Sequence, residues 1–173
     1  VFFDDGKAYL YHVRLQEGNR IFVAELTEDL SAIKTETLNE CLHATTGWEN
    51  TQNTDWPVSE GPTVFKKGKT YYLMYSANDF RNPDYAVGYA TATHPLGPWI
   101  KHEGNPIISG INTHQSGIGH GDLFTDQNGM LCYVLHTHNS KNQVGPRKTG
   151  SVQLRFKDGI LELVPDSFKQ IKL

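Results

Sequence analysis

The sequence predicts an all-β chain built from about three four-stranded antiparallel blades of an incomplete β-propeller. Three observations predict this fold. An aromatic residue, a polar turn with glycine and an aromatic-rich strand follow one another three times, and the anchoring Phe3, Phe65 and Phe124 lie 62 and 59 residues apart. A run with strand-like alternation of apolar and polar residues follows each repeat. Helical patterns are almost absent, so we expect one partial propeller domain over residues 1–173.

The first unit, approximately residues 1–43, opens on the run VFFDDGKAYLYHV. Its Asp5-Gly6 pair is typical of a two-residue hairpin turn, because both residue types tolerate a positive φ. We therefore expect Asp4 and Asp5 to be solvated turn residues and not catalytic carboxylates. Further strands are expected in RIFVAEL at 20–26 and AIKTETL at 32–38, with a short capped turn at 26–31 between them.

The second and third units, approximately residues 58–103 and 117–166, repeat this order. The second unit has a hairpin turn at Lys67-Gly68 and a further strand in YAVGYAT at 85–91. The third has a hairpin within DLFTDQNGMLCYVLHTH, from residue 122, and strands at 151–156 and 159–164. The long polar segments between the units, rich in glycine and asparagine, are where substrate contacts are expected.

A β-sandwich is the alternative architecture for a chain of short alternating strands. Roughly 60 residues per unit with four strands each favour propeller blades. Three blades fall short of the roughly 4–8 that close a propeller ring, so we expect this chain to be part of a longer protein.

The composition excludes several classes of protein. The net charge is −3, and 16 basic and 19 acidic residues are scattered along the chain, so no basic stripe is present to bind nucleic acid. No apolar run approaches the ~20 residues of a membrane helix, which indicates a soluble chain without a membrane partner. Cys41 and Cys132 are too few and too far apart for a disulfide framework or a zinc site, so two buried thiols are expected.

Glu60 and His120 stand in equivalent places, a few residues ahead of Phe65 and Phe124. In a propeller the first strand of each blade lines the central channel, so both side chains are expected at the channel mouth. Each lies next to glycine, which lets backbone and ligand approach closely. From the residues alone, two interpretations of Glu60 stay open: a solvated turn carboxylate, or a carboxylate presented for chemistry.

Motifs along nearly the whole chain resemble those of glycoside hydrolase family 43. They are FFDDGKAYLYH, SEGPTVFKKGKTYYLMYS, ATATHPLGPW, GIGHGDLF, and LHTHN followed by PRKTGSVQLRF. The resemblance implies a partial five-bladed β-propeller from enzymes that remove arabinofuranosyl or xylosyl units from plant oligo- and polysaccharides. It implies that Glu60 is the general acid and that Arg147 contacts substrate. His120 is implied to lie near the hub, to contact substrate, and to face a calcium ion directly or through water.

An inverting glycosidase needs one protonated carboxyl to donate to the leaving oxygen and one carboxylate to activate water, ~6.5–9.5 Å away. To act as that acid near neutral pH, Glu60 needs a pKa raised above ~4.3 by burial or by nearby negative charge. The resemblance places the base and the pKa-raising Asp upstream of Val1, so we expect the isolated chain to be inactive. No cofactor is required for this chemistry. The resemblance implies a structural calcium ion.

Two tryptophans near Glu60, Trp48 and Trp56, are either sugar platforms or loop-packing residues, and Trp48 is a candidate substrate contact. His136 and His138 lack partners at a convincing spacing for zinc. A non-catalytic carbohydrate-binding propeller is the alternative function, since it would not need Glu60. A protein-interaction propeller lacks its signature repeats here. Open blades at the ends of the chain are expected to be covered by N-terminal blades or by another copy.

Overall fold

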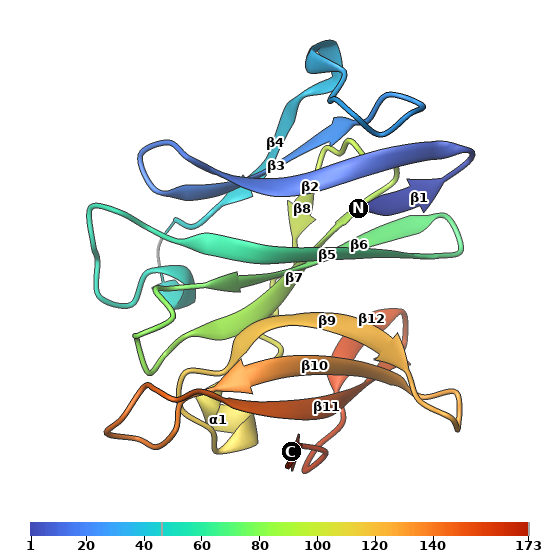
Figure 1. Ribbon diagram of the computed structural model, residues 1–173. Coiled ribbons are helices and arrows are strands. Elements are labelled where there is room, and N and C mark those ends of the chain that lie inside the picture. The colour runs from blue at the N-terminus through green and yellow to red at the C-terminus, as the bar shows by residue number, and fades with distance from the viewer. Residues whose placement is uncertain (46, 173) are drawn as a thin grey trace.

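Three antiparallel sheets follow one another along the chain and stack face to face (Figure 1). The structure is a computed structural model that describes residues 1–45 and 47–172. It confirms the all-β class and the three blade-like sheets of a partial propeller. Within the described ranges, no helix is long and apolar enough to cross a bilayer.

The first sheet contains β1 (Phe2–Asp4), β2 (Lys7–Leu15), β3 (Asn19–Glu25) and β4 (Asn39–His43), in that spatial order. Asp5 and Gly6 have φ values of 47° and 75°, so the predicted turn between β1 and β2 is confirmed. The strand predicted at 32–38 is wrong. Thr35–Thr37 forms a 3₁₀ turn, and the Thr37 hydroxyl accepts the Glu25 N–H at 2.9 Å in place of a paired strand.

The second sheet contains β5 (Ser59–Lys67), β6 (Thr70–Ala77), β7 (Ala86–Ala92) and the short β8 (Ile100–Lys101). Lys67 pairs with Thr70 across the first hairpin, so the turn lies at Gly68-Lys69, one residue later than predicted. A 3₁₀ turn, Gly47–Glu49, precedes this sheet.

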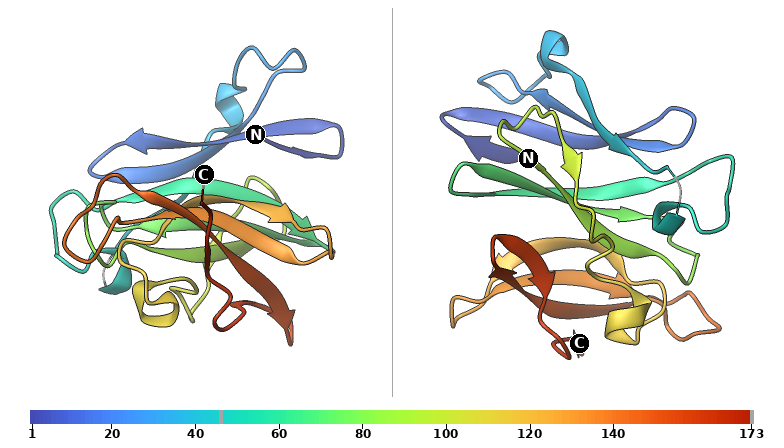
Figure 2. Two further views of the ribbon diagram at one scale, coloured as in Figure 1. Left: turned by 60° about the horizontal axis from the view of Figure 1, so that its bottom comes forward. Right: turned by 180° about the vertical axis from the view of Figure 1, so that it is seen from behind.

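The third sheet contains β9 (Gly119–Thr125), β10 (Leu131–Thr137) and β11 (Lys148–Lys157). Its outer position is shared by β12 (Ile160–Leu163) and β13 (Lys169–Gln170), because both pair with β11 at different places. The link from the second sheet carries the short helix α1 (Gly110–Thr113), drawn in yellow beside the third sheet in Figure 2.

Strand β6 supplies side chains to both hydrophobic layers of the molecule. Tyr72 and Met74 belong to the layer between the second and third sheets, and Leu73 and Tyr75 belong to the layer between the first and second. Successive side chains of a strand point to opposite faces, so one strand can fill two layers. The second sheet is therefore buried on both faces and aligns its two neighbours.

The two cysteines, Cys41 and Cys132, are free and buried, as predicted. Burial raises the pKa of both thiols, because the thiolate would lose its hydration. Trp99 packs edge-on against Tyr11 with ring centroids 6.0 Å apart. These groups are packing residues.

Asp4 is not the solvated turn residue that the sequence predicts. Its carboxylate accepts hydrogen bonds from Lys66 Nζ at 2.8 Å and from Tyr71 Oη at 2.5 Å. The Lys66 ammonium and the Tyr71 hydroxyl lower the pKa of Asp4. The prediction failed because Asp4 lies against the β5–β6 hairpin of the next sheet. That hairpin supplies an ammonium donor, Lys66, and a phenol donor, Tyr71.

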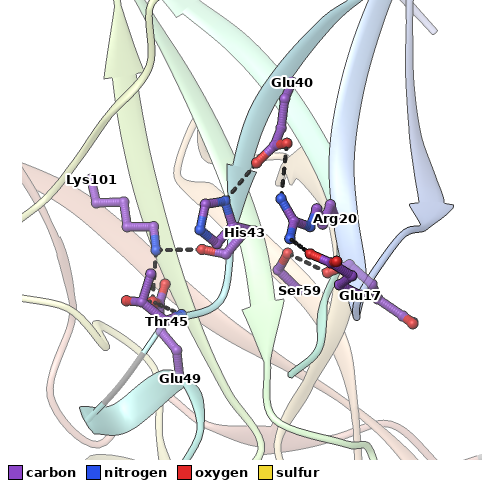
Figure 3. A network of polar contacts seen from close by, with 9 residues as sticks. Glu17, Arg20, Glu40, His43, Thr45, Glu49, Ser59 and Lys101 are labelled. Carbon is purple, nitrogen blue, oxygen red and sulfur yellow. Dashed lines mark hydrogen bonds and ion pairs between the residues drawn. The ribbon is translucent and has the colours of Figure 1, made fainter. Parts of the chain in front are cut away.

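Buried Glu49 fastens the segment that leads from the first sheet to β5 (Figure 3). Its Oε2 accepts from the Thr45 N–H and hydroxyl, both at 3.0 Å, and from Lys101 Nζ at 2.6 Å. Its Oε1 accepts from Tyr75 Oη at 2.7 Å. Lys101 also donates to the His43 carbonyl at 2.7 Å. One ammonium group therefore joins β8 to β4 and to the segment between β4 and β5 that contains Glu49.

Replacing Glu49 by alanine is expected to lower the free energy of unfolding by about 3 kcal/mol, because Lys101 and Tyr75 lose a buried charged acceptor. The matched control is Glu40→Ala. The Glu40 side chain is 32% exposed and pairs with Arg20 and His43, so the expected loss is below about 1 kcal/mol. Urea unfolding of both variants measures the difference, and equal losses would contradict this role of Glu49.

Candidate functional site

A hollow of about 460 Å³ lies where β1 and β2 of the first sheet face β5 and β9, the first strands of the other two sheets. Figure 1 shows β2, β5 and β9 running side by side on the near side of the molecule. Glu60 and His120 both line this hollow, so the structure brings them together at the hub and not at the outer rim. Its wall also includes Val1, Phe2, Tyr11, Val13, Gly61, Pro62, Thr63, Val64, Gly121 and Asp122.

The same irregularity occurs in β5 and β9. In β5 the register moves from Glu60 opposite Ser76 to Thr63 opposite Met74, which leaves one extra residue on the inner strand. In β9 it shifts in the same way between Gly119 and Asp122. A bulge bends a strand and re-aims a side chain. The unpaired residues are Gly61 and Pro62 in β5 and His120 and Gly121 in β9. The bulge therefore follows Glu60 directly in β5, whereas His120 lies within the bulge of β9.

Two glycines are required at this crossing for steric reasons. Gly61 has φ of 59°, and a Cβ atom there would lie 3.3 Å from the His120 ring. A Cβ atom on Gly119 would lie 2.4 Å from the ring of Tyr85. The glycines after Glu60 and before His120 therefore allow β5, β9 and Tyr85 to approach closely.

Glu60 has two polar neighbours, and both contact its Oε1 atom. Tyr85 Oη donates a hydrogen bond at 2.7 Å, and His120 Nδ1 lies 3.7 Å away. The Glu60 side chain is 22% exposed and that of His120 is 52% exposed. The His120 backbone N–H donates to Ser76 Oγ at 2.8 Å, which fixes the backbone of β9 against β6.

The pKa of Glu60 is lowered in this structure. Burial raises it, but the His120 ring and the Tyr85 hydroxyl stabilise the carboxylate by more than burial destabilises it. The negative charge of Asp79 acts in the raising direction without reversing the result. The raised pKa expected of a general acid is therefore not produced by the described residues of this chain.

Arg147 lies close to this region but does not line the hollow. Its guanidinium carbon is 5.1 Å from the centroid of the Phe80 ring, and the Arg81 guanidinium is 5.6 Å from the same ring. Burial and then the charge of Arg147 lower the pKa of His136. Because His136 pairs with Gly119 across the sheet, Arg147 lies at the same end of β9 and β10 as His120.

Trp48 is not brought to the hollow around Glu60. Its ring packs against Tyr75, with centroids 5.7 Å apart, and a Cβ atom on Gly88 would touch it at 2.8 Å. It lines a separate hollow of about 410 Å³ that also includes Pro106 and Ile111. Trp56, in contrast, is 50% exposed and lies on the loop immediately before β5.

Two residues of this site, Tyr85 and Asp122, were not expected from the sequence. Tyr85 is 1% exposed and donates to Glu60, although in the sequence it looks like an ordinary strand residue. Asp122 Oδ1 accepts from Thr63 Oγ1 at 2.5 Å and joins β9 to β5. Its position two residues after His120 was a usable signal, but the intervening bulge, which decides where it points, is invisible in the sequence.

The oxygen ligands near His120 are too few for a calcium site made by this chain alone. Calcium takes about 6–8 oxygen ligands, and Glu60 and Asp122 are the two carboxylates of the hub hollow. Among residues 1–45 and 47–172, no three His, Cys, Asp or Glu side chains are grouped to hold a metal ion. Calcium at His120 stays a prediction that requires additional ligands.

Comparison with known proteins identifies the family. The model of glycosyl hydrolases family 43 matches residues 1–161. The chain belongs to glycoside hydrolase family 43. Its sheets superpose on an endo-1,4-beta-xylanase from Bacteroides thetaiotaomicron with a TM-score of 0.88 and 43% identity, over 94% of this chain and 56% of that one.

Two further relatives of this family 43 chain agree in extent. A thermostable family-43 glycoside hydrolase has a TM-score of 0.85 and 38% identity, over 94% of this chain and 55% of its own. The beta-D-galactofuranosidase xynD of Aspergillus niger is 28% identical over 133 residues, which are 77% of this chain and 34% of xynD. The chain thus spans about half the length of these solved structures and about a third of xynD.

The Glu60 carboxyl is expected to titrate below its ordinary pKa of 4.5 in this chain, and Tyr85→Phe is expected to raise that pKa by removing a donor. Carboxyl-detected NMR during a pH titration measures both values. Because the folded pKa is depressed, the stability that this carboxylate contributes is present above its unfolded pKa and is lost as the pH falls through the folded value. A wild-type pKa above 4.5 would contradict the geometry around Oε1.

Proposed function

We propose that this chain is part of an inverting glycosidase that hydrolyses arabinofuranosyl or xylosyl linkages in plant polysaccharides, with Glu60 as general acid. One observation carries the proposal. Glu60 lies directly before the bulge of β5 and lines the hollow that β1, β2, β5 and β9 enclose, in a chain of family 43. A hub hollow suits two-carboxylate chemistry, since groups from different blades can face each other across a sugar.

The two carboxyl oxygens of Glu60 have different surroundings, and we assign them different roles. Oε1 is held by Tyr85 and faces His120, so Oε2 is the atom that holds the proton and presents it to the leaving oxygen. Tyr85 fixes the carboxyl group and does not titrate near neutral pH, because burial raises its pKa further above the ordinary value of 10.0. Positioning of this kind keeps the donor within hydrogen-bond reach of the glycosidic oxygen.

Because the pKa of Glu60 is lowered in this chain, its action as a general acid requires further groups that raise that pKa. We place the catalytic base and the carboxylate that raises the pKa of Glu60 in blades that precede this chain, facing the hub hollow. A negative charge there would favour the protonated form of Glu60 and reverse the effect of His120 and Tyr85. In the same proposal, Arg147 and His120 bind substrate hydroxyls, and Trp48 contacts a more distant sugar. No step depends on the predicted calcium ion.

The relatives support a pentosyl or furanosyl substrate. One neighbour is an endo-1,4-beta-xylanase and one relative is a beta-D-galactofuranosidase. Xylosyl and arabinofuranosyl linkages share with these substrates either the backbone sugar or the furanose ring. An oligo- or polysaccharide is therefore the proposed partner.

The open edge of the first sheet supports further blades or a second copy as the cover. Strand β2 runs to Leu15, but β1 pairs with it only from Lys7 to Tyr9. Leu15 is 73% exposed and Phe3 is 65% exposed. Unpaired strand edges and exposed apolar residues of this kind call for a partner.

Glu60→Gln in the complete enzyme is expected to lower kcat on an oligosaccharide by roughly 10²–10⁴, the usual contribution of a general acid. The loss on a nitrophenyl glycoside should be smaller, because nitrophenolate leaves without a proton. Glu162→Gln is the matched control, since Glu162 pairs with Arg155 on the outer strands of the third sheet. Steady-state kinetics of both variants on both substrates test the role, and equal losses on the two substrates would argue against a proton donor.

The purified 173-residue chain is expected to release no nitrophenol from nitrophenyl arabinofuranoside or xyloside, because it lacks the proposed base. The readout is absorbance over a long incubation at high protein concentration. Turnover that Glu60→Gln abolishes would refute the assignment of the base to another part of the protein.

A non-catalytic sugar-binding propeller is the second candidate, and the lowered pKa of Glu60 favours it. Such a protein would keep its aromatic contacts and would not use Glu60 as an acid. Sugar binding by the complete protein, unaffected by Glu60→Gln and without hydrolysis, would select this function.

A further inference from the structure

A second hollow, of about 450 Å³, opens beside the loop that leads into β5. Its wall includes Thr54, Trp56 and Val58 from that loop, and Asp79, Arg81 and Asn82 from the connection between β6 and β7. This wall combines a large aromatic face with charged and amide groups, a composition suited to a ligand with one apolar face and several hydroxyls.

This hollow adjoins the hub. Val58 is two residues before Glu60, and two residues of extended chain span about 7 Å. Asp79 is two residues after Ala77, which pairs with Ser59 next to Glu60. The two hollows therefore lie at neighbouring positions along β5 and the loop before it.

The Trp56 ring is held in place although it is half exposed. Its Nε1–H donates to Asn19 Oδ1 at 3.0 Å. The backbone beside it is pinned by the same residue, because the Asn19 N–H donates to the Pro57 carbonyl at 2.9 Å and Ser59 Oγ donates to the Asn19 carbonyl at 2.9 Å. A fixed aromatic face loses little conformational entropy when a ligand stacks on it.

Asp79 and Arg81, which line the same hollow, form a bidentate ion pair. Arg81 Nε and Nη2 donate to the two Asp79 carboxylate oxygens at 2.7 and 2.8 Å, and the Arg81 backbone N–H donates to Oδ1 at 2.9 Å. The pair carries no net charge, which disfavours a charged ligand. The remaining guanidinium N–H groups and carboxylate lone pairs match adjacent hydroxyls of a neutral sugar.

We propose that this hollow is a subsite for the neutral sugar ring next to the bond cleaved at Glu60, with Trp56 stacking on the ring and Asp79 and Arg81 binding its hydroxyls. The assignment rests on the proposed function for its place along the substrate. The sugar-binding part does not depend on the proposed function. It rests on the exposed Trp56 ring, the Asp79–Arg81 ion pair and the loop held by Asn19.

Isothermal titration of the 173-residue chain with xylotetraose and with an arabinan tetrasaccharide tests the subsite. Wild-type protein is expected to bind at least one of them, and Trp56→Ala to bind about tenfold more weakly. Trp56→Phe keeps a stacking face and should lose less. Arg81→Ala, at an exposed position, should weaken binding severalfold and provides a second variant if Trp56→Ala does not fold. Ile160→Ala, at a residue with 47% exposure on β12, is the matched control and should bind like wild type.

The outcomes separate this inference from the proposed function. Tetrasaccharide binding that Trp56→Ala and Arg81→Ala leave unchanged, or no binding by wild type at millimolar sugar, would overturn the subsite. The complete protein could also bind a tetrasaccharide through Trp56 and hydrolyse neither one. That result would support the subsite and contradict the proposed hydrolase function.

Discussion

The burial of the second sheet on both faces is the constraint on which the rest of the structure depends. Strand β6 places Tyr72 and Met74 in one hydrophobic layer and Leu73 and Tyr75 in the other. Full burial of side chains of this size contributes about 1.5–3 kcal/mol each, so both neighbouring sheets are held against this strand. With the sheets aligned, β2, β5 and β9 lie side by side, and these strands and β1 enclose the hollow that contains Glu60 and His120.

The pKa of the Glu60 carboxyl is set by opposing effects. Burial disfavours its charge, while Tyr85 and His120 favour it, and the second effect prevails in this chain. General-acid chemistry needs the opposite balance, which a further carboxylate at the hub would supply. The arrangement separates the two requirements of an acid. The described residues fix where the carboxyl points, whereas the proposed partners from other blades set how firmly it holds its proton.

The segment before β5 is fastened at two places, at its beginning by residues of the second sheet and at its end by the first sheet. Glu49 holds its beginning through Lys101, Tyr75 and Thr45, and Asn19 holds its end at Trp56, Pro57 and Ser59. A loop tied at both ends presents Trp56 and Glu60 with little freedom, as a preorganised site requires. The end of this segment, which contains Trp56, therefore depends on hydrogen bonds made by Asn19 of the first sheet.

The sequence by itself determined the strand pattern, the Asp5-Gly6 turn, the two buried thiols, the family and the convergence of Glu60 and His120, because alternation, turn chemistry and motif spacing are local properties. It misplaced the strand at 32–38, since a side-chain hydroxyl of Thr37 takes the place of a backbone partner there. The contact of Asp4 with Lys66 and Tyr71, the donor Tyr85, the lowered pKa of Glu60 and the choice of Trp56 over Trp48 as the exposed ring were decided by tertiary structure alone. Each depends on which groups from distant parts of the chain meet, and on two bulges whose single extra residue leaves no mark on hydrophobic periodicity.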